Sequence, residues 1–162
     1  HPVAHSFPTR RSSDLARRSR ELLEAAGYRV LDNESVEVAP GLVVAGVPDD
    51  RGARQVGALP ADLDRALSGV DPDAAVIMLQ HSPEHEERIA ALGVDLLLDG
   101  HTHGGQIWPF HYAVATSYPH YGGIYRVGDM IQVVSRGAGR WGPPMRLFAP
   151  SDVVLVTLRA RL

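Results

Sequence analysis

The sequence contains no cysteine, no lysine and no long uncharged apolar stretch. Without cysteine, disulfide bonds and thiolate-bound structural zinc are excluded. No segment approaches the roughly 20 apolar residues that a membrane-spanning helix requires. The formal net charge of −3 gives no reason to expect nucleic acid as a partner. With 162 residues, 44% of them apolar and 22% charged, the chain has the composition of an ordinary globular domain.

The most informative residues are His101 and His103, within the run Asp-Gly-His-Thr-His-Gly-Gly-Gln at positions 99–106. Side chains alternate along an extended backbone, so we expect both imidazoles on one side and Thr102 on the other. The glycines that follow allow a sharp turn and close approach of a ligand. A third histidine, His81, follows an earlier apolar run. Because imidazole is a good ligand for Zn, Mn, Fe or Co, the three histidines predict part of a metal site.

Helix and strand patterns alternate in the first half of the chain, and strand patterns dominate the second half. This order predicts an α/β fold with a mixed sheet. The expected helices are residues 16–26, 61–67 and 83–92, and residues 48–60 are expected to form a loop. The expected strands are residues 28–31, 35–38, 42–47, 74–79, 94–98, 123–127, 130–134 and 153–158. Both histidine motifs therefore follow strands, where α/β proteins place ligand sites.

Other polar residues have two interpretations each. Arg136 and Arg140 lie in a glycine-rich loop after a strand, where they contact a phosphate or simply face solvent. His111 and His120 lie in an aromatic, proline-containing loop, for which a position bordering a substrate cleft is the less favoured interpretation. Asp99 is expected to orient a metal ligand or cap the turn rather than to bind metal.

The histidine motifs resemble those of the calcineurin-like metallophosphoesterases. They read Leu-Gln-His-Ser-Pro-Glu at 79–84 and Gly-His-Thr-His-Gly-Gly-Gln-Ile at 100–107. The continuation Trp-Pro-Phe-His-Tyr at 108–112 is similar to a bacterial subgroup whose catalytic domain is often anchored to the membrane. The resemblance covers essentially residues 16–162. It implies the C-terminal half of a four-layer α/β/β/α sandwich with mixed sheets.

The resemblance also implies an enzyme that hydrolyses phosphoric esters at a dinuclear centre of divalent ions, which are Mn, Fe, Zn or Co. In such centres two ions about 3.5–4 Å apart polarise the phosphoryl group and activate a hydroxide that attacks phosphorus. By position, His81 and His101 would bind one ion and His103 the other. The substrate is a phosphomonoester, a phosphodiester or a lipid- or envelope-linked pyrophosphate, and the sequence does not choose among them.

The family's other ligands come from Asp-x-His, Gly-Asp-x-x-Asp and Gly-Asn-His-Asp/Glu motifs, and none of these precedes His81 here. The family's general-acid histidine belongs to the last of them, so no catalytic residue is assigned. Residues 5–15 resemble a translated sequencing adapter. We therefore expect residues 1–15 to be non-native and residues 16–162 to be a truncated, inactive metallophosphoesterase domain. The full-length bacterial parent is expected to carry a hydrophobic membrane anchor before this domain.

Two alternatives remain open from the residues alone. One is a mononuclear three-histidine metal site, for which a fourth ligand is not evident in the sequence. The other is a non-catalytic binding module that keeps the second half of the fold.

Overall fold

The computed structural model describes residues 10–159. The chain divides into two compact units, with the boundary after Gln80. Helices and both parallel and antiparallel strand pairs occur, which confirms the expected α/β class with mixed pairing. Within residues 10–159, no helix combines the length and the apolar character needed to cross a bilayer. Residues 1–9 of the adapter-like segment lie outside the described residues.

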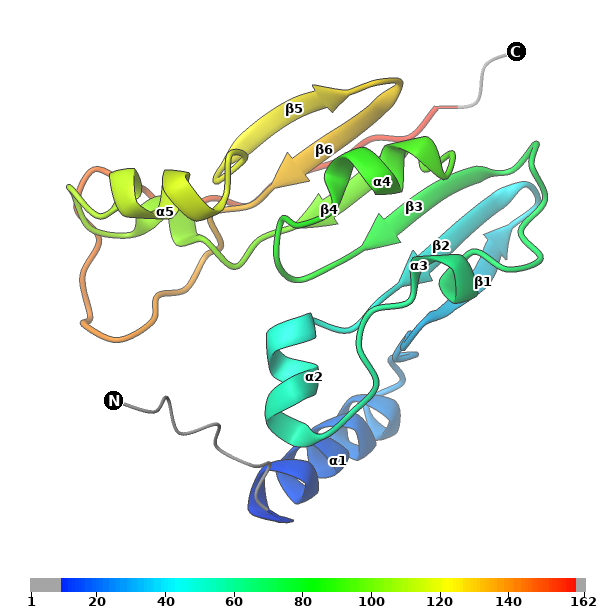
Figure 1. Ribbon diagram of the computed structural model, residues 1–162, viewed down its shortest axis with the longest axis horizontal. Helices are drawn as coiled ribbons and strands as arrows, with labels where there is room; N and C mark the ends of the chain where they lie inside the picture. The colour runs from blue at the N-terminus through cyan, green and yellow to red at the C-terminus, as the bar shows by residue number, and fades with distance from the viewer. Residues whose placement is uncertain (1–9, 160–162) are drawn as a thin grey trace. The chain divides into compact units, whose positions relative to one another are not determined.

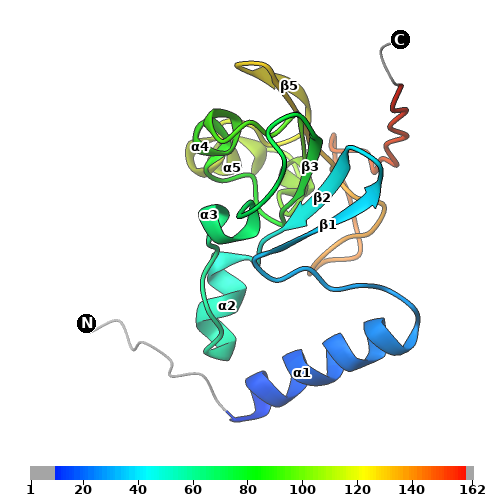
Figure 2. The same cartoon turned by 90° about the vertical axis from the view of Figure 1, so that its right-hand side faces the viewer.

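The first unit is built on a three-stranded ladder with β2 in the middle (Figures 1 and 2). β1 pairs antiparallel with β2, and β2 pairs parallel with β3. The side chains of Val43 and Ala45 on β2 and of Met78 on β3 are buried, so this ladder carries much of the unit's core. Its elements are α1 (Arg10–Ala25), β1 (Glu34–Ala39), β2 (Leu42–Gly46), α2 (Asp50–Val56), α3 (Leu63–Ala66) and β3 (Ala75–Leu79).

Three expectations for the first unit are wrong. The first helix begins at Arg10 rather than at residue 16, and no strand forms at residues 28–31. The expected loop at 48–60 contains α2. This helix begins where the Asp49 carboxylate accepts a hydrogen bond of 2.7 Å from the Gly52 N–H, and it ends at Gly57 in the left-handed conformation. Its capping residues, rather than an apolar face, define it.

The second unit repeats this pattern of one hairpin and one parallel strand (Figure 1). β5 and β6 form the expected hairpin, and β4 pairs parallel with β6. The side chains of Leu97, Met130 and Val134 are fully or almost fully buried and form its core. Its elements are α4 (Glu86–Ala91), β4 (Leu96–Asp99), the 3₁₀ turn η1 (His103–Gly105), α5 (His111–Ser117), β5 (Gly123–Val127) and β6 (Met130–Val134).

In this unit one expected helix is shorter, one helix was not expected, and one expected strand is absent. The helix expected at 83–92 is limited to Glu86–Ala91, and α5 was not anticipated. The strand expected at 153–158 does not form. The side chains of Val153 and Leu155 are 87% and 90% exposed. The apolar character of this segment favours a strand, but within residues 10–159 no ladder partner is assigned to it.

Replacing Leu97 with alanine should strongly destabilise the fold, because the fully buried side chain would leave a cavity in β4. We expect a loss of about 2–5 kcal/mol in the free energy of unfolding. Ile124→Ala is the matched control, since Ile124 lies on β5 and is 70% exposed. Denaturant unfolding followed by far-UV circular dichroism measures both, and equal losses would contradict this description of the core.

Candidate functional site

The histidine loop, defined as residues 100–106, begins where β4 ends. β4 runs parallel to β6, with Asp99 opposite Val134, so the loop leaves the carboxyl end of this strand pair. The Gly100 N–H donates to the carbonyl of His81 at 3.0 Å. This backbone bond joins the segment of His81 to the start of the loop. The two histidine motifs therefore lie together, each after the carboxyl end of a strand, as predicted from the sequence.

The loop backbone is not extended. His101, His103 and Gln106 have φ angles of 67°, 52° and 51°, which lie in the left-handed region that non-glycine residues seldom adopt. The expectation that His101 and His103 share one side of an extended segment is therefore wrong. Each such residue costs on the order of 1–3 kcal/mol, and such residues cluster at functional sites.

Two features hold the loop in this conformation. The Thr102 hydroxyl donates to the Tyr121 carbonyl at 2.7 Å and accepts from the Gly104 N–H at 3.3 Å. Gly105 has a φ of 79°, and a Cβ built on it would lie only 2.5 Å from the Cα of His111. The first turn of α5 thus packs directly on the loop backbone, and position 105 has no room for a side chain.

His81 and His101 are brought together. Nε2 of His81 and Nδ1 of His101 lie 3.0 Å apart, with the two rings edge to face and their centroids 4.9 Å apart. Two imidazole nitrogens at about 2.0–2.1 Å from one metal ion would lie about 2.9–3.4 Å apart for octahedral or tetrahedral angles. The two nitrogens form a hydrogen bond with each other, and their separation also fits two ligand atoms of one ion.

His103 has a different environment. Its Nδ1 lies 3.0 Å from Nη2 of Arg146. A guanidinium has only donors, so Nδ1 accepts this bond and the neutral ring carries its proton on Nε2. Burial, followed by the positive charge of Arg146 and the influence of His81, lowers the pKa of His103. In this arrangement neither ring nitrogen of His103 offers a free lone pair to a metal ion.

Arg146 is the central cation of the site, and the sequence reasoning did not single it out. Its guanidinium donates to the carbonyls of His103 at 3.2 Å, Ala149 at 3.1 Å and Arg136 at 2.8 Å. It also donates to the carbonyls of Gly137 and Gly139. One side chain therefore ties the histidine loop to the segment 136–149. The only signal in the sequence was the glycine-rich Arg-containing pattern of that segment.

Asp99 belongs to a buried polar chain behind the histidine loop. Its Oδ2 accepts from Nε2 of Gln132 at 2.7 Å, and Oε1 of Gln132 lies 2.5 Å from Nδ1 of His120. The His120 ring stacks on Tyr125 and lies 3.9 Å from the carboxylate of Glu86. Burial, with the charge of Glu86 adding to it and the Gln132 bond opposing it, raises the pKa of Asp99 to about 7.

The polar chain gives a structural role to His120 and Gln132. His120 is partly buried and joins the polar chain through Gln132 of β6. Gln132 was not predicted from the sequence, although it is the one amide within the apolar run of β6.

His111 is the first residue of α5 and lies against Tyr112, with ring centroids 4.0 Å apart. The side chain of Arg136 packs against Gly104 and Gly122.

The amino-acid sequence of this chain is similar to those of several known proteins. The chain is 41% identical over 146 residues to an uncharacterized metallophosphoesterase of Aquifex aeolicus, covering 88% of this chain and 55% of that protein. It is 36% identical over 142 residues to another from Campylobacter jejuni, covering 86% of this chain and 37% of that protein. The chain is homologous to metallophosphoesterases.

A metallophosphoesterase domain also occurs in a transmembrane protein of Bos taurus, which is 38% identical over 102 residues and is covered over 23% of its length. The chain thus spans about half, or less, of the length of the metallophosphoesterases it matches. No family model matches the sequence, and no solved structure matches it.

Gln132→Leu should destabilise the second unit, because it removes the partner of a buried carboxylate and a partly buried imidazole while keeping the side-chain size. We expect a loss of about 1–3 kcal/mol in the free energy of unfolding. Gln55→Leu, at an exposed position in α2, is the matched control and should change it little. Chemical denaturation measures both, and a neutral Gln132→Leu would refute the structural role of the polar chain.

Arg146→Lys should loosen segment 136–149, because an ammonium cannot reach five carbonyls as the guanidinium fork does. We expect a loss of about 1–3 kcal/mol and faster proteolytic cleavage within this segment. Arg126→Lys, on the exposed face of β5, should leave both quantities near their original values. Limited proteolysis with mass spectrometry locates the cuts, and unchanged cleavage in Arg146→Lys would contradict the central role of Arg146.

Proposed function

We propose that this chain carries the histidine side of the metal centre of a phosphoester hydrolase. His81 and His101 would hold one divalent ion and His103 a second. The observation that carries the proposal is the 3.0 Å separation of Nε2 of His81 and Nδ1 of His101 on a strained loop at the carboxyl end of β4. The homologous metallophosphoesterases support the same chemistry.

The donor set fits one ion better than two. His81 and His101 face each other as two imidazoles of one ion would, whereas Arg146 occupies Nδ1 of His103. Release of that contact would make Nδ1 available. We therefore propose that His103 joins the centre only after Arg146 withdraws from Nδ1.

The residues of this chain would hold and orient the reacting groups. Bound divalent ions supply Lewis-acid polarisation of a phosphoryl oxygen and a nucleophile from water at neutral pH. The lowered pKa of His103 favours its neutral form, which a ligand must have. Gln132 and His120 fix Asp99 at the end of β4, and so fix the point from which the histidine loop departs.

Membrane attachment of the full-length protein is also a proposal. Relatives from Bos taurus and Danio rerio are named transmembrane proteins with a metallophosphoesterase domain. These names support the proposal that the full-length protein is attached to a membrane. We propose in addition that its phosphoester substrate lies at or in the cell envelope.

The purified chain should bind Mn²⁺ or Zn²⁺, and His81→Gln and His101→Gln should each lower the affinity at least tenfold, because each removes one of two facing donors. His103→Gln should have the smaller effect, since Arg146 already occupies Nδ1. Equilibrium dialysis with elemental analysis gives both affinity and stoichiometry.

His111→Gln is the control, because His111 lies on α5 beside Tyr112. Equal losses in His111→Gln and His101→Gln would overturn the assignment. One tightly bound ion that needs all three candidate histidines would favour the mononuclear alternative.

The chain by itself should not hydrolyse an aryl phosphodiester in the presence of Mn²⁺, because three imidazoles provide no carboxylate to balance two divalent ions. In a full-length homologous protein the same assay should give turnover that is lost when the residue equivalent to His101 is changed to Gln. Robust hydrolysis by residues 16–162 would overturn the expected inactivity. Absence of turnover in every full-length homologue would favour a binding module.

A further inference from the structure

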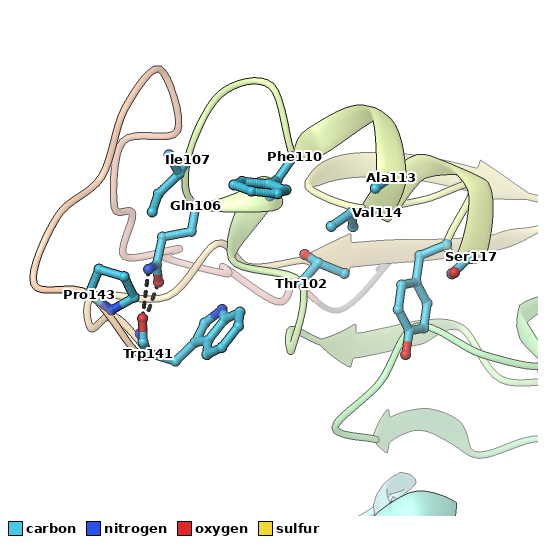
Figure 3. A pocket seen from close by; sticks show the side chains of 11 residues that line it. Thr102, Gln106, Ile107, Phe110, Ala113, Val114, Ser117, Trp141 and Pro143 are labelled. Atoms are coloured by element: carbon cyan, nitrogen blue, oxygen red, sulfur yellow. Dashed lines mark hydrogen bonds between the residues drawn. The ribbon is translucent and has the colours of Figure 1, made fainter. Parts of the chain in front are cut away.

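An apolar cavity of about 470 Å³ lies beside the histidine loop (Figure 3). Its volume falls within the range of about 300–1,000 Å³ typical of small-molecule sites, which are lined mainly by apolar and aromatic groups. Residues between 102 and 118, which include part of the histidine loop and most of α5, and the segment 136–149 form its walls. The apolar lining residues are Ile107, Phe110, Ala113, Val114, Trp141 and Pro143.

The cavity is built into the fold by a buried amide. Gln106 is 3% exposed, and its Nε2 donates to the Trp141 carbonyl at 2.7 Å while its Oε1 accepts from the Trp141 N–H at 2.9 Å (Figure 3). The backbone adds two bonds, from the Leu147 N–H to the Gln106 carbonyl at 2.9 Å and from the Trp108 N–H to the Leu147 carbonyl at 3.0 Å. These bonds fix the position of the segment 136–149 relative to the histidine loop.

The cavity adjoins the candidate metal ligands. Thr102, which lies between His101 and His103 in sequence, lines it. Tyr118 lines it as well, and its ring meets the His101 ring edge to face with centroids 5.5 Å apart. An organic group held in this cavity would therefore have its end next to the imidazoles.

Charge and exposure distinguish the two ends of such a ligand. Arg146 lies on the same segment as Trp141 and contacts His103, so its positive charge favours an anionic group beside the histidines. Trp141 and Phe110 are 67% and 62% exposed at the cavity, so large apolar surfaces face solvent. Contiguous exposed apolar surface of this kind is often a binding site.

We propose that this cavity binds the hydrocarbon part of an amphiphilic phosphoester, with the phosphate at the histidines. The proposal rests on the proposed function and names its substrate class, a phosphate ester of an alkyl or comparably apolar alcohol. The occupant is the substrate's own apolar substituent rather than a protein segment.

The test uses the full chain carrying Trp108→Phe, which leaves Trp141 as the only tryptophan. Butyl, hexyl and octyl phosphate are titrated below their micelle concentrations while Trp141 fluorescence is followed. Each added methylene should raise the affinity about fourfold, the ratio that corresponds to burial of one methylene group. The emission of Trp141 should shift to shorter wavelength as the hydrocarbon replaces water.

Ala113→Phe, which fills the cavity, should abolish the dependence on chain length. Thr116→Phe is the matched control, because it introduces the same side chain at an exposed position of α5 outside the cavity lining. If Ala113→Phe loses the parent far-UV circular dichroism, Val114→Phe replaces it. Equal chain-length dependence in the filled and control variants would overturn the proposal.

Two further measurements separate this proposal from its rivals. Octanol that binds as tightly as octyl phosphate would overturn the assignment of a phosphate ester. Sedimentation that reveals a dimer abolished by Ala113→Phe would make the cavity a self-association surface and also overturn it. Metal binding by the same samples is independent: intact metal affinity without chain-length dependence refutes the cavity alone. Chain-length dependence without metal affinity refutes the proposed hydrolase centre.

Discussion

The positive φ angles of His101, His103 and Gln106 are the constraint on which the second unit's site depends. Three non-glycine residues in this region cost several kcal/mol in total at about 1–3 kcal/mol each. The Thr102 hydroxyl, the Gln106 amide and the Arg146 guanidinium each bond to the main chain and offset that cost. Because these bonds reach residues 121, 141 and 103, the loop conformation and the walls around it form together.

Much of the strand framework was predictable, and the helices were less so. β2, β3, β4 and β6 coincide with apolar runs that hold buried side chains, and such runs predict burial. β5 has no buried residue, and it was predicted from its place in the hairpin. α2 is defined by Asp49 and Gly57 at its ends, and α5 has no buried residue at all. Periodicity cannot detect a helix without an apolar face. The segment 153–158 is an apolar run that forms no strand, because apolar side chains alone do not specify a partner for pairing.

The candidate site was predictable in its residues but not in its geometry. The sequence predicted that His81 and His101 lie together, because each follows the carboxyl end of a strand. In the structure their ring nitrogens lie 3.0 Å apart. The rotation of His103 toward Arg146 was not predictable, because it depends on a contact across 43 positions of sequence. The partnership of Asp99, Gln132 and His120 depends likewise on strand register. Whether the histidines bind metal stays a prediction.

The absence of space at Gly105 has a consequence for engineering. A Cβ there would collide with the backbone of α5, and the neighbouring Gln106 is bonded to Trp141. A designer who grafts only the short histidine motif onto another scaffold would leave behind the groups that fix its conformation. The smallest transferable module is therefore discontinuous: it combines the loop, α5 and the segment 136–149. Its parts must be inherited or redesigned together.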